Sequence, residues 1–156
     1  MNKRIWLVIA VLAVAASLVL VAPVGAWEEY QGCTPGYWKQ PHHYDSWVTY
    51  TEDDMFSDIF GTGPDMTLLE VLQKKGGGAK WALYRHAVAG ILNVTSPDVT
   101  YKYVVGPDPQ TVSSCVEWYK HQHTVIGKVQ IAFCEGDFEK WKGFLEAANE
   151  SYCPLD

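Results

Sequence analysis

The chain lacks the short residue spacings that mark common catalytic and structural metal sites. No two cysteines have the close Cys-x-x-Cys spacing that structural zinc favours. There is no His-Glu-x-x-His run and no Gly-x-Ser-x-Gly elbow. The acidic residues between Glu52 and Asp65 do not follow the regular spacing of a calcium loop. We therefore expect no metal, no cofactor and no catalytic residues, and the sequence favours a protein that is not an enzyme.

Basic residues are scarce. The chain has 12 Lys and Arg against 18 Asp and Glu, which gives a formal charge of −6. Its first 26 residues contain Lys3 and Arg4 but no acid, so the remainder carries −8. The ten other basic residues are scattered along the sequence rather than striped. Such a chain has little with which to neutralise phosphates, so we exclude nucleic acid as a partner.

The N-terminus carries one long apolar run. Lys3 and Arg4 precede apolar residues 5–22, and the small residues of 23–26 follow. This order is typical of a secretory signal peptide cleaved after Ala26. The alternative is an uncleaved anchor, because 18 apolar residues can just span a bilayer. Both alternatives place residues 27–156, which we expect to form one domain, outside the cytoplasm: secreted, periplasmic or at the cell envelope.

All four cysteines follow the predicted export segment, and an even number in an exported chain indicates disulfides. Three pairings are possible. We favour Cys33–Cys153, which would join the two ends of the domain, together with Cys115–Cys134. A zinc site built from the four thiolates is the weaker alternative.

Helix signals dominate the first half of the domain. Thr51 and the three acids after it predict a helix start, with the helix running to about residue 60. Thr67 and Glu70 form the pattern of a capping box. Apolar residues recur at three- and four-residue steps over 79–93, which predicts a buried central helix.

The second half is also mainly helical. Residues 99–105 could form an extended strand, and 110–134 fit one long helix or two helices broken near 121–124. Asp137 is expected to cap a last helix whose inner stripe contains Phe138, Trp141, Leu145 and Ala148. The predicted fold class is therefore mainly α: a small disulfide-stapled domain of about four to six helices with an irregular, aromatic-rich N-terminal segment.

That aromatic-rich segment, residues 27–50, is the main candidate for binding. Its rings are interrupted by glycines and prolines, so no helical period survives. For the set of rings as a whole we favour core filling, and the alternative is a binding face, because rings that are not buried offer flat faces to sugars, peptides or other rings. We expect Tyr37, Trp38, Tyr44 and Trp47 to be the exposed members. The candidate ligand-binding residues are Tyr37, Trp38, Lys39, His42, Tyr44 and Trp47.

Two further patterns concern possible chemistry and modification. An exported hydrolase or metal-binding protein could use His42 or His43 with a carboxylate such as Asp45 or Glu52, provided that these side chains meet in a cleft. Residues 93–95 and 149–151 fit the N-glycosylation acceptor pattern Asn-x-Ser/Thr.

Three segments together resemble a family of secreted bacterial and archaeal modules that open with Cys-Thr-Pro-Gly-Tyr-Trp-Lys. Residues 32–39 match that opening, residues 85–93 are similar to the family's alanine-rich helix, and Asn149 with residues 153–155 resembles its closing segment. The resemblance implies prokaryotic origin, export, a single domain and an opening cysteine paired with a closing one. It implies no reaction, because the family has no established activity.

The chain departs from that family at several positions. Gln40-Pro41-His42 stands in place of Asn-His-Pro, Tyr152 stands in place of a glycine, and Cys115 and Cys134 are additions. From the sequence we expect an exported, non-enzymatic binding or structural module whose partner is a glycan, a cell-envelope component or another protein. Contact with a membrane is expected only if the N-terminal segment is retained.

Overall fold

The regular structure of the protein is helical. The computed structural model describes residues 29–155, so the expected export segment, residues 1–26, lies outside the described part. The α-helices are α2 (Pro35–Trp38), α3 (Phe56–Phe60), α4 (Leu68–Gln73), α5 (Gly78–Thr95), α6 (Cys115–Trp118), α7 (Val125–Glu135) and α8 (Phe138–Asn149). Short 3-10 helices are η1 (Pro41–Ser46), η2 (Pro109–Thr111) and η3 (Tyr119–His121). The predicted mainly α fold is confirmed, and no helix within 29–155 is long and apolar enough to cross a bilayer.

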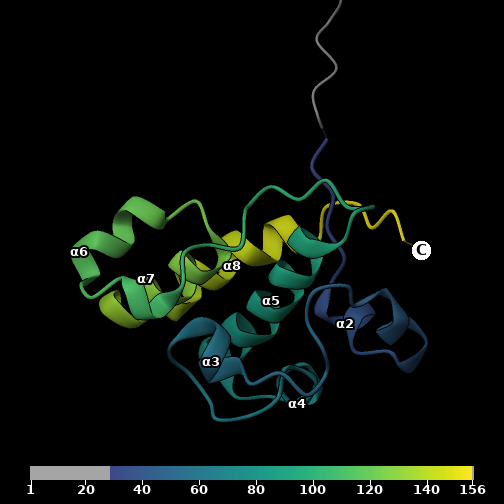
Figure 1. Ribbon diagram of the computed structural model, residues 1–156, viewed down its shortest axis with the longest axis horizontal. Coiled ribbons are helices and arrows are strands. Elements are labelled where there is room, and N and C mark those ends of the chain that lie inside the picture. Colours follow the sequence, from purple (N-terminus) through teal and green to yellow (C-terminus); the bar gives the residue numbers. More distant parts are fainter. Residues whose placement is uncertain (1–28, 156) are drawn as a thin grey trace, which may run out of the picture.

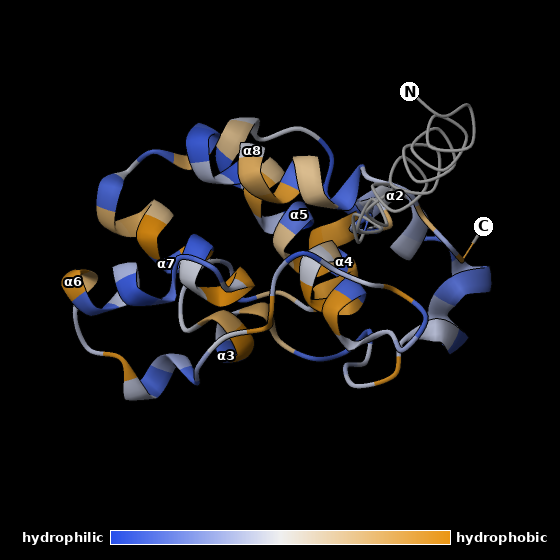
Figure 2. Ribbon diagram, turned by 90° about the horizontal axis from the view of Figure 1, so that it is seen from above, coloured by the Kyte–Doolittle hydropathy of each residue, from blue (hydrophilic) through white to orange (hydrophobic). Residues whose placement is uncertain are grey.

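Helix α5 is the centre of the fold, as the periodicity of 79–93 predicts. Helix α8 packs along it, and α2, α4 and α7 also contact it (Figure 1). Every residue of α5 from Leu83 to Asn93 except Arg85 is buried. Small residues permit the close packing: a Cβ at Gly90 would lie 3.2 Å from a methyl group of Val125 in α7. The hydrophobic residues of α3, α4, α5 and α7 meet in the interior, and burying each large side chain contributes about 1.5–3 kcal/mol (Figure 2).

The helix caps follow the sequence signals in two places and depart from them in a third. The capping box of Thr67 and Glu70 opens α4, and the Asp137 carboxylate accepts a hydrogen bond from the Lys140 amide at the start of α8. The expected cap at Thr51 is wrong. Helix α3 begins only at Phe56, and the Thr51 amide instead donates to the Asp54 carboxylate at 2.7 Å. Asp54 therefore stabilises a turn that precedes the helix.

The expected strand over 99–105 is not formed. Within this segment the described structure has only an isolated bridge between Val104 and Thr124. The region 110–134 is divided, with α6 and α7 separated by a break that includes residues 122–124. Thr124 caps α7 by accepting from the Gly127 amide at 2.9 Å. A Cβ at Gly127 would overlap the carbonyl oxygen of His121, so this glycine is needed for the tight turn.

Both favoured disulfides are present, Cys33–Cys153 and Cys115–Cys134. All four sulfurs are thus used, and the alternative of a four-thiolate zinc site is wrong. The bonds close sequence separations of 120 and 19 residues. In the chain-entropy model, loops of these sizes contribute about 3–5 kcal/mol each.

A buried amide on α5 fixes both ends of the domain. The side-chain oxygen of Asn93 accepts from the Cys33 amide at 2.8 Å and from the Trp38 indole at 3.1 Å. The Asn93 side-chain nitrogen donates to the Cys33 carbonyl at 2.9 Å and to the Asn149 side-chain oxygen at 2.9 Å. Asn149 also receives a 2.6 Å bond from the Tyr101 hydroxyl. We call Asn93, Asn149 and these partners the amide clasp.

The clasp predicts a large cost for losing one side chain. Asn93→Ala should lower the free energy of unfolding by about 3–5 kcal/mol, because it leaves the Cys33 backbone groups and the Trp38 indole buried without partners. The measurement is urea unfolding of the oxidised protein. Gln122→Ala is the matched control, since it removes an exposed amide and should change stability by under about 0.5 kcal/mol. Equal small effects for both variants would contradict the role of the clasp.

Candidate functional site

The expected N-terminal binding face is partly internal. Trp38 is fully buried and Trp47 is 9% exposed, so the expectation that these two rings are exposed is wrong. Thr34 caps α2 and directs Trp38 into the core, where its indole reaches Asn93. The Trp47 indole nitrogen is buried and has no hydrogen-bond partner among the described residues. Local turn signals did not reveal this burial because α2 is held by contacts with the distant helix α5.

The other four predicted binding residues do reach the surface. Lys39 and His42 are exposed, whereas Tyr37 and Tyr44 are half-buried. The Tyr37 ring stacks on His43 at 3.7 Å, and its hydroxyl donates to the carbonyl of Leu155 at 3.3 Å. The three described cavities are lined by other residues. These side chains thus offer an outer surface, and the cleft that a hydrolase using His42 or His43 would need is not among those cavities.

The largest described cavity lies beside the start of the aromatic segment. This groove of about 470 Å³ is lined by Tyr30 and Tyr152, by the charged residues Glu29 and Lys102, and by Ser151 and two alanines at the end of α8. Tyr30 is 46% exposed and Tyr152 is 64% exposed. We call it the tyrosine groove. Two sequence signals point to this groove. Tyr30 belongs to the aromatic segment, and Tyr152 stands where the pattern of the secreted modules has a glycine.

Main-chain pairing holds the groove in shape. The Gln31 amide donates to the Thr100 carbonyl at 2.8 Å, and the Gly32 amide donates to the Tyr152 carbonyl at 2.9 Å. A Cβ at Gly32 would overlap the Ala148 carbonyl oxygen, so only glycine permits this approach to α8. The backbone beneath both tyrosines is therefore fixed by residues far apart in the sequence.

The two N-glycosylation patterns fall on the amide clasp. Asn93 and Asn149 are both 0% exposed, and each side-chain nitrogen donates hydrogen bonds inside the protein. In the folded protein neither amide is accessible for modification. The match to the acceptor pattern therefore reflects asparagines required by the fold.

One lysine is buried among aromatic rings. The Lys128 side chain on α7 donates to the Gln122 carbonyl, and its ammonium lies 4.1 Å from the Tyr103 ring centre and 5.1 Å from that of Phe144. Burial, together with the smaller effect of nearby Lys102, lowers the pKa of Lys128 to about 8. The apolar residues around Lys128 in the sequence are the signal for this position, since a lysine in such a helix must bury its stem.

Within residues 29–155, the side chains that could together hold a metal ion are those of His86, Glu146 and Glu150. One ligand atom from each lies within 4.8 Å of the others, and His86 Nε2 is 3.7 Å from a Glu146 carboxylate oxygen. The second oxygen of Glu146 is 3.1 Å from the Lys142 ammonium. The histidine in this group is His86, which the sequence did not single out.

The amide clasp sets the tautomer of His86. The Asn149 side-chain nitrogen donates to the His86 carbonyl at 2.8 Å and lies 3.3 Å from His86 Nδ1, so Nδ1 must be the acceptor and Nε2 carries the proton. The proton thus sits on the nitrogen that faces Glu146, and a metal ion there would have to displace it. Burial lowers the pKa of His86 to about 4, although Glu146 acts in the opposite direction. The ring is neutral near pH 7.

This arrangement predicts acid sensitivity. The folded pKa of about 4 lies below the ordinary 6.5, so between these pH values the unfolded chain binds a proton that the folded protein does not. The free energy of unfolding should fall by up to about 3 kcal/mol as the pH drops from 6.5 to 4. In His86→Gln this contribution should vanish, whereas exposed His123→Gln should retain it. Chemical unfolding at pH 6.5 and at pH 4 measures this change in the free energy of unfolding. An equal change in the wild type and in both variants would refute the role of His86.

The comparisons with known proteins add no relative: no family model, no curated protein and no solved structure matches the chain.

Proposed function

We propose that this chain is an exported, non-enzymatic binding or structural module of a prokaryotic cell envelope or extracellular space, and that its aromatic N-terminal region binds a glycan. The tyrosine groove is the observation that carries this proposal. Two exposed tyrosines beside polar and charged groups suit a sugar ring, whose CH face stacks on an aromatic ring while its hydroxyls form hydrogen bonds. The two disulfides are compatible with an oxidising compartment.

The proposed relation to the secreted modules supports the same site. Trp38, Asn93 and Asn149, which belong to the three segments of the resemblance, are buried together in the amide clasp. These three shared residues thus serve the scaffold, and the proposal places the ligand on residues that the scaffold leaves on the surface. Tyr152, one of the departures from the family pattern, is the most exposed tyrosine described.

The groove also lies close to the proposed cleavage site. Glu29 is three residues beyond Ala26, a span of at most about 10 Å. If the export segment is removed, the new N-terminus lies two residues before Glu29, which lines the groove. If the segment is retained as an anchor, the same groove faces envelope components close to the membrane.

The hydrolase and metal-binding alternative receives less support. His43 stacks on Tyr37, and neither His42 nor Asp45 lines a described cavity. A glycan that is cleaved during incubation, detected as new reducing ends, would favour this alternative over a binding module.

Binding to purified cell-wall glycans and to a glycan array tests the proposal. Tyr30→Ala and Tyr152→Ala should each weaken glycan binding about tenfold, because each removes a stacking contact of roughly 1–1.5 kcal/mol. Tyr119→Ala is the matched control, since Tyr119 is 42% exposed and belongs to η3, outside the groove. All variants should melt as cooperatively as the wild type.

Two outcomes would contradict the proposal. If the groove variants bind like the wild type while Lys39→Ala and Tyr44→Ala do not bind, the site lies on the outer surface of the N-terminal segment. If the wild type binds no glycan, the sugar-binding function is wrong. Trp38→Ala is unsuitable for this test, because the buried indole belongs to the amide clasp and its loss would damage the fold.

A further inference from the structure

A second surface carries an excess of positive charge in an otherwise acidic chain. Between Glu70 and Asp98 the sequence contains no acidic residue but has four basic ones, Lys74, Lys75, Lys80 and Arg85. Lys74, Lys75 and Lys80 are exposed, and Arg85 is partly buried. The first turn of α5 likewise contains no acidic side chain. This region therefore has the opposite sign to the net charge of the protein.

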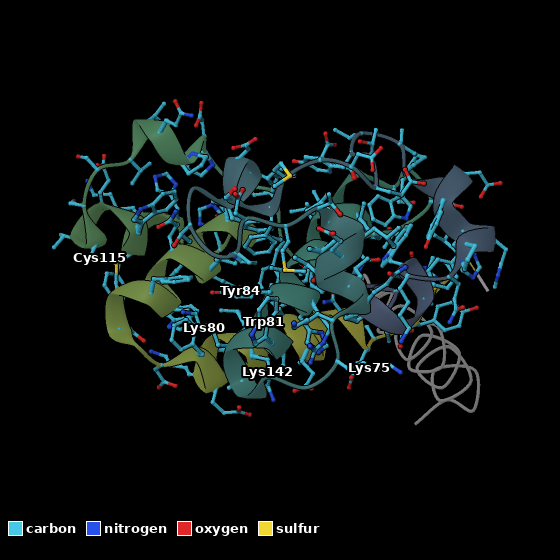
Figure 3. The ribbon with its side chains drawn as sticks, turned by 90° about the horizontal axis from the view of Figure 1, so that it is seen from below. Lys75, Lys80, Trp81, Tyr84, Cys115 and Lys142 are labelled. Carbon is cyan, nitrogen blue, oxygen red and sulfur yellow. A yellow bond between two sulfur atoms is a disulfide. The ribbon has the colours of Figure 1, made fainter. Side chains whose placement is uncertain are left out.

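Two of these cations lie beside one tryptophan, Trp81: Lys74 contacts its ring, and Lys80 lines the same cavity. The Arg85 guanidinium donates to the carbonyls of Lys74 at 2.9 Å and Gly76 at 3.2 Å, which holds the glycine-rich loop against α5. The Lys74 ammonium lies 5.4 Å from the centre of the Trp81 ring. Figure 3 shows Lys75, Lys80 and Trp81 on one face of the molecule. Residues that are scattered along the sequence thus share one surface in the fold.

The cations of this group are not paired with carboxylates. Among the described residues, none of the salt bridges involves Lys74, Lys75, Lys80 or Arg85. On the same face, Lys142 holds Glu139 at 2.6 Å and Glu146 at 3.1 Å, so these acids are already engaged (Figure 3). The Glu70 carboxylate closes the capping box of α4. The positive charge is thus available to an external anion.

An aromatic cavity adjoins the cations. It has a volume of about 240 Å³ and is lined by Lys80, Trp81 and Tyr84 of α5 and by Gly63 and Pro64 of the loop between α3 and α4. The Trp81 and Tyr84 rings meet edge to face at 5.4 Å between centres. The Lys80 ammonium lies 4.9 Å from the ring centre of Phe133, which places this charge over aromatic side chains. The cavity combines a half-buried indole with a cation at its wall.

We propose that the cationic surface around Trp81, formed by Lys74, Lys75, Lys80 and Arg85, binds an acidic polysaccharide. A sugar ring contacts Trp81 in the cavity, and carboxylate or phosphate groups on the same polymer meet the lysines and Arg85. The indole favours a ring-bearing polymer over a plain polyanion, and the unpaired cations favour an acidic polymer over a neutral one. This site is separate from the tyrosine groove, so either can fail without the other.

Titration of the full exported protein with three polymers tests this inference. Polygalacturonate carries rings and carboxylates, dextran carries rings without charge, and polyphosphate carries charge without rings. The wild type should bind polygalacturonate more tightly than the other two, and the affinity should fall as salt is raised. Lys75→Glu and Lys80→Glu should each weaken polygalacturonate binding about tenfold. Lys120→Glu is the charge-matched control on η3 and should bind like the wild type.

A tryptophan variant separates ring contact from charge. Trp81→Leu should weaken polygalacturonate binding while leaving the weaker polyphosphate binding unchanged. Because this variant could lose stability, the lysine variants, which are exposed, carry the test if it unfolds. A teichoic-type glycosyl phosphate polymer used beside polygalacturonate identifies which acidic group is preferred.

Four results would overturn the inference. Equal binding of polygalacturonate by Lys75→Glu, Lys80→Glu and the wild type would place the polymer elsewhere. Equal affinity for polyphosphate and polygalacturonate would show a charge-only surface. A salt-sensitive dimer that dissociates in Lys75→Glu would show that the surface is occupied by the acidic face of a second copy. Loss of polygalacturonate binding in Tyr30→Ala alone would assign the polymer to the tyrosine groove.

Discussion

The side-chain amide of Asn93 is the constraint on which the rest of the domain depends. The side-chain oxygen of Asn93 faces the Cys33 amide and the Trp38 indole, which can only donate hydrogen bonds. Its side-chain nitrogen faces the Cys33 carbonyl, which can only accept one. The orientation of Asn93 is therefore fixed, and through it that of Asn149 and the proton on His86. Cys33 is held twice, by this amide and by its bond to Cys153. One buried side chain thus aligns the opening segment, the central helix and the closing segment.

This arrangement separates scaffold from surface. The opening motif invites interpretation as a binding motif because it is dense in aromatic residues, but its tryptophan is used internally. The rings left outside belong to residues that the clasp does not need, including Tyr30 and Tyr152 at the groove. A module built in this way can keep its interior while its exposed aromatic and charged residues change, because substitutions there leave the buried hydrogen bonds intact.

The sequence predicts features that depend on neighbouring residues better than those that depend on distant ones. The capping box at Thr67, the cap at Asp137 and the periodic helix α5 are local, and all three are confirmed. The disulfide pairing was also predicted, because four cysteines leave few alternatives. Burial of Trp38 depends on an asparagine 55 residues away, and no local pattern contains that information. The candidate surfaces, likewise, bring together residues from separate segments.

The separation of basic from acidic residues on the surface is the long-range effect that is hardest to see in the sequence. It follows from the burial of most of α5. Ten of its residues are buried against α8 and neighbouring elements, which leaves no room for acids along most of its length. Its early turns and the loop before them are exposed and carry only cations, while the acids of α8 pair with Lys142 on the same helix. From Lys80 to Asn93 the helix rises about 20 Å. The cationic surface thus lies at the beginning of α5 and the clasp near its end. The tyrosine groove includes the C-terminal end of α8, which the clasp joins to the end of α5. A single extended polymer would therefore have to span a distance comparable to this rise of α5 to contact both the groove and the cationic surface.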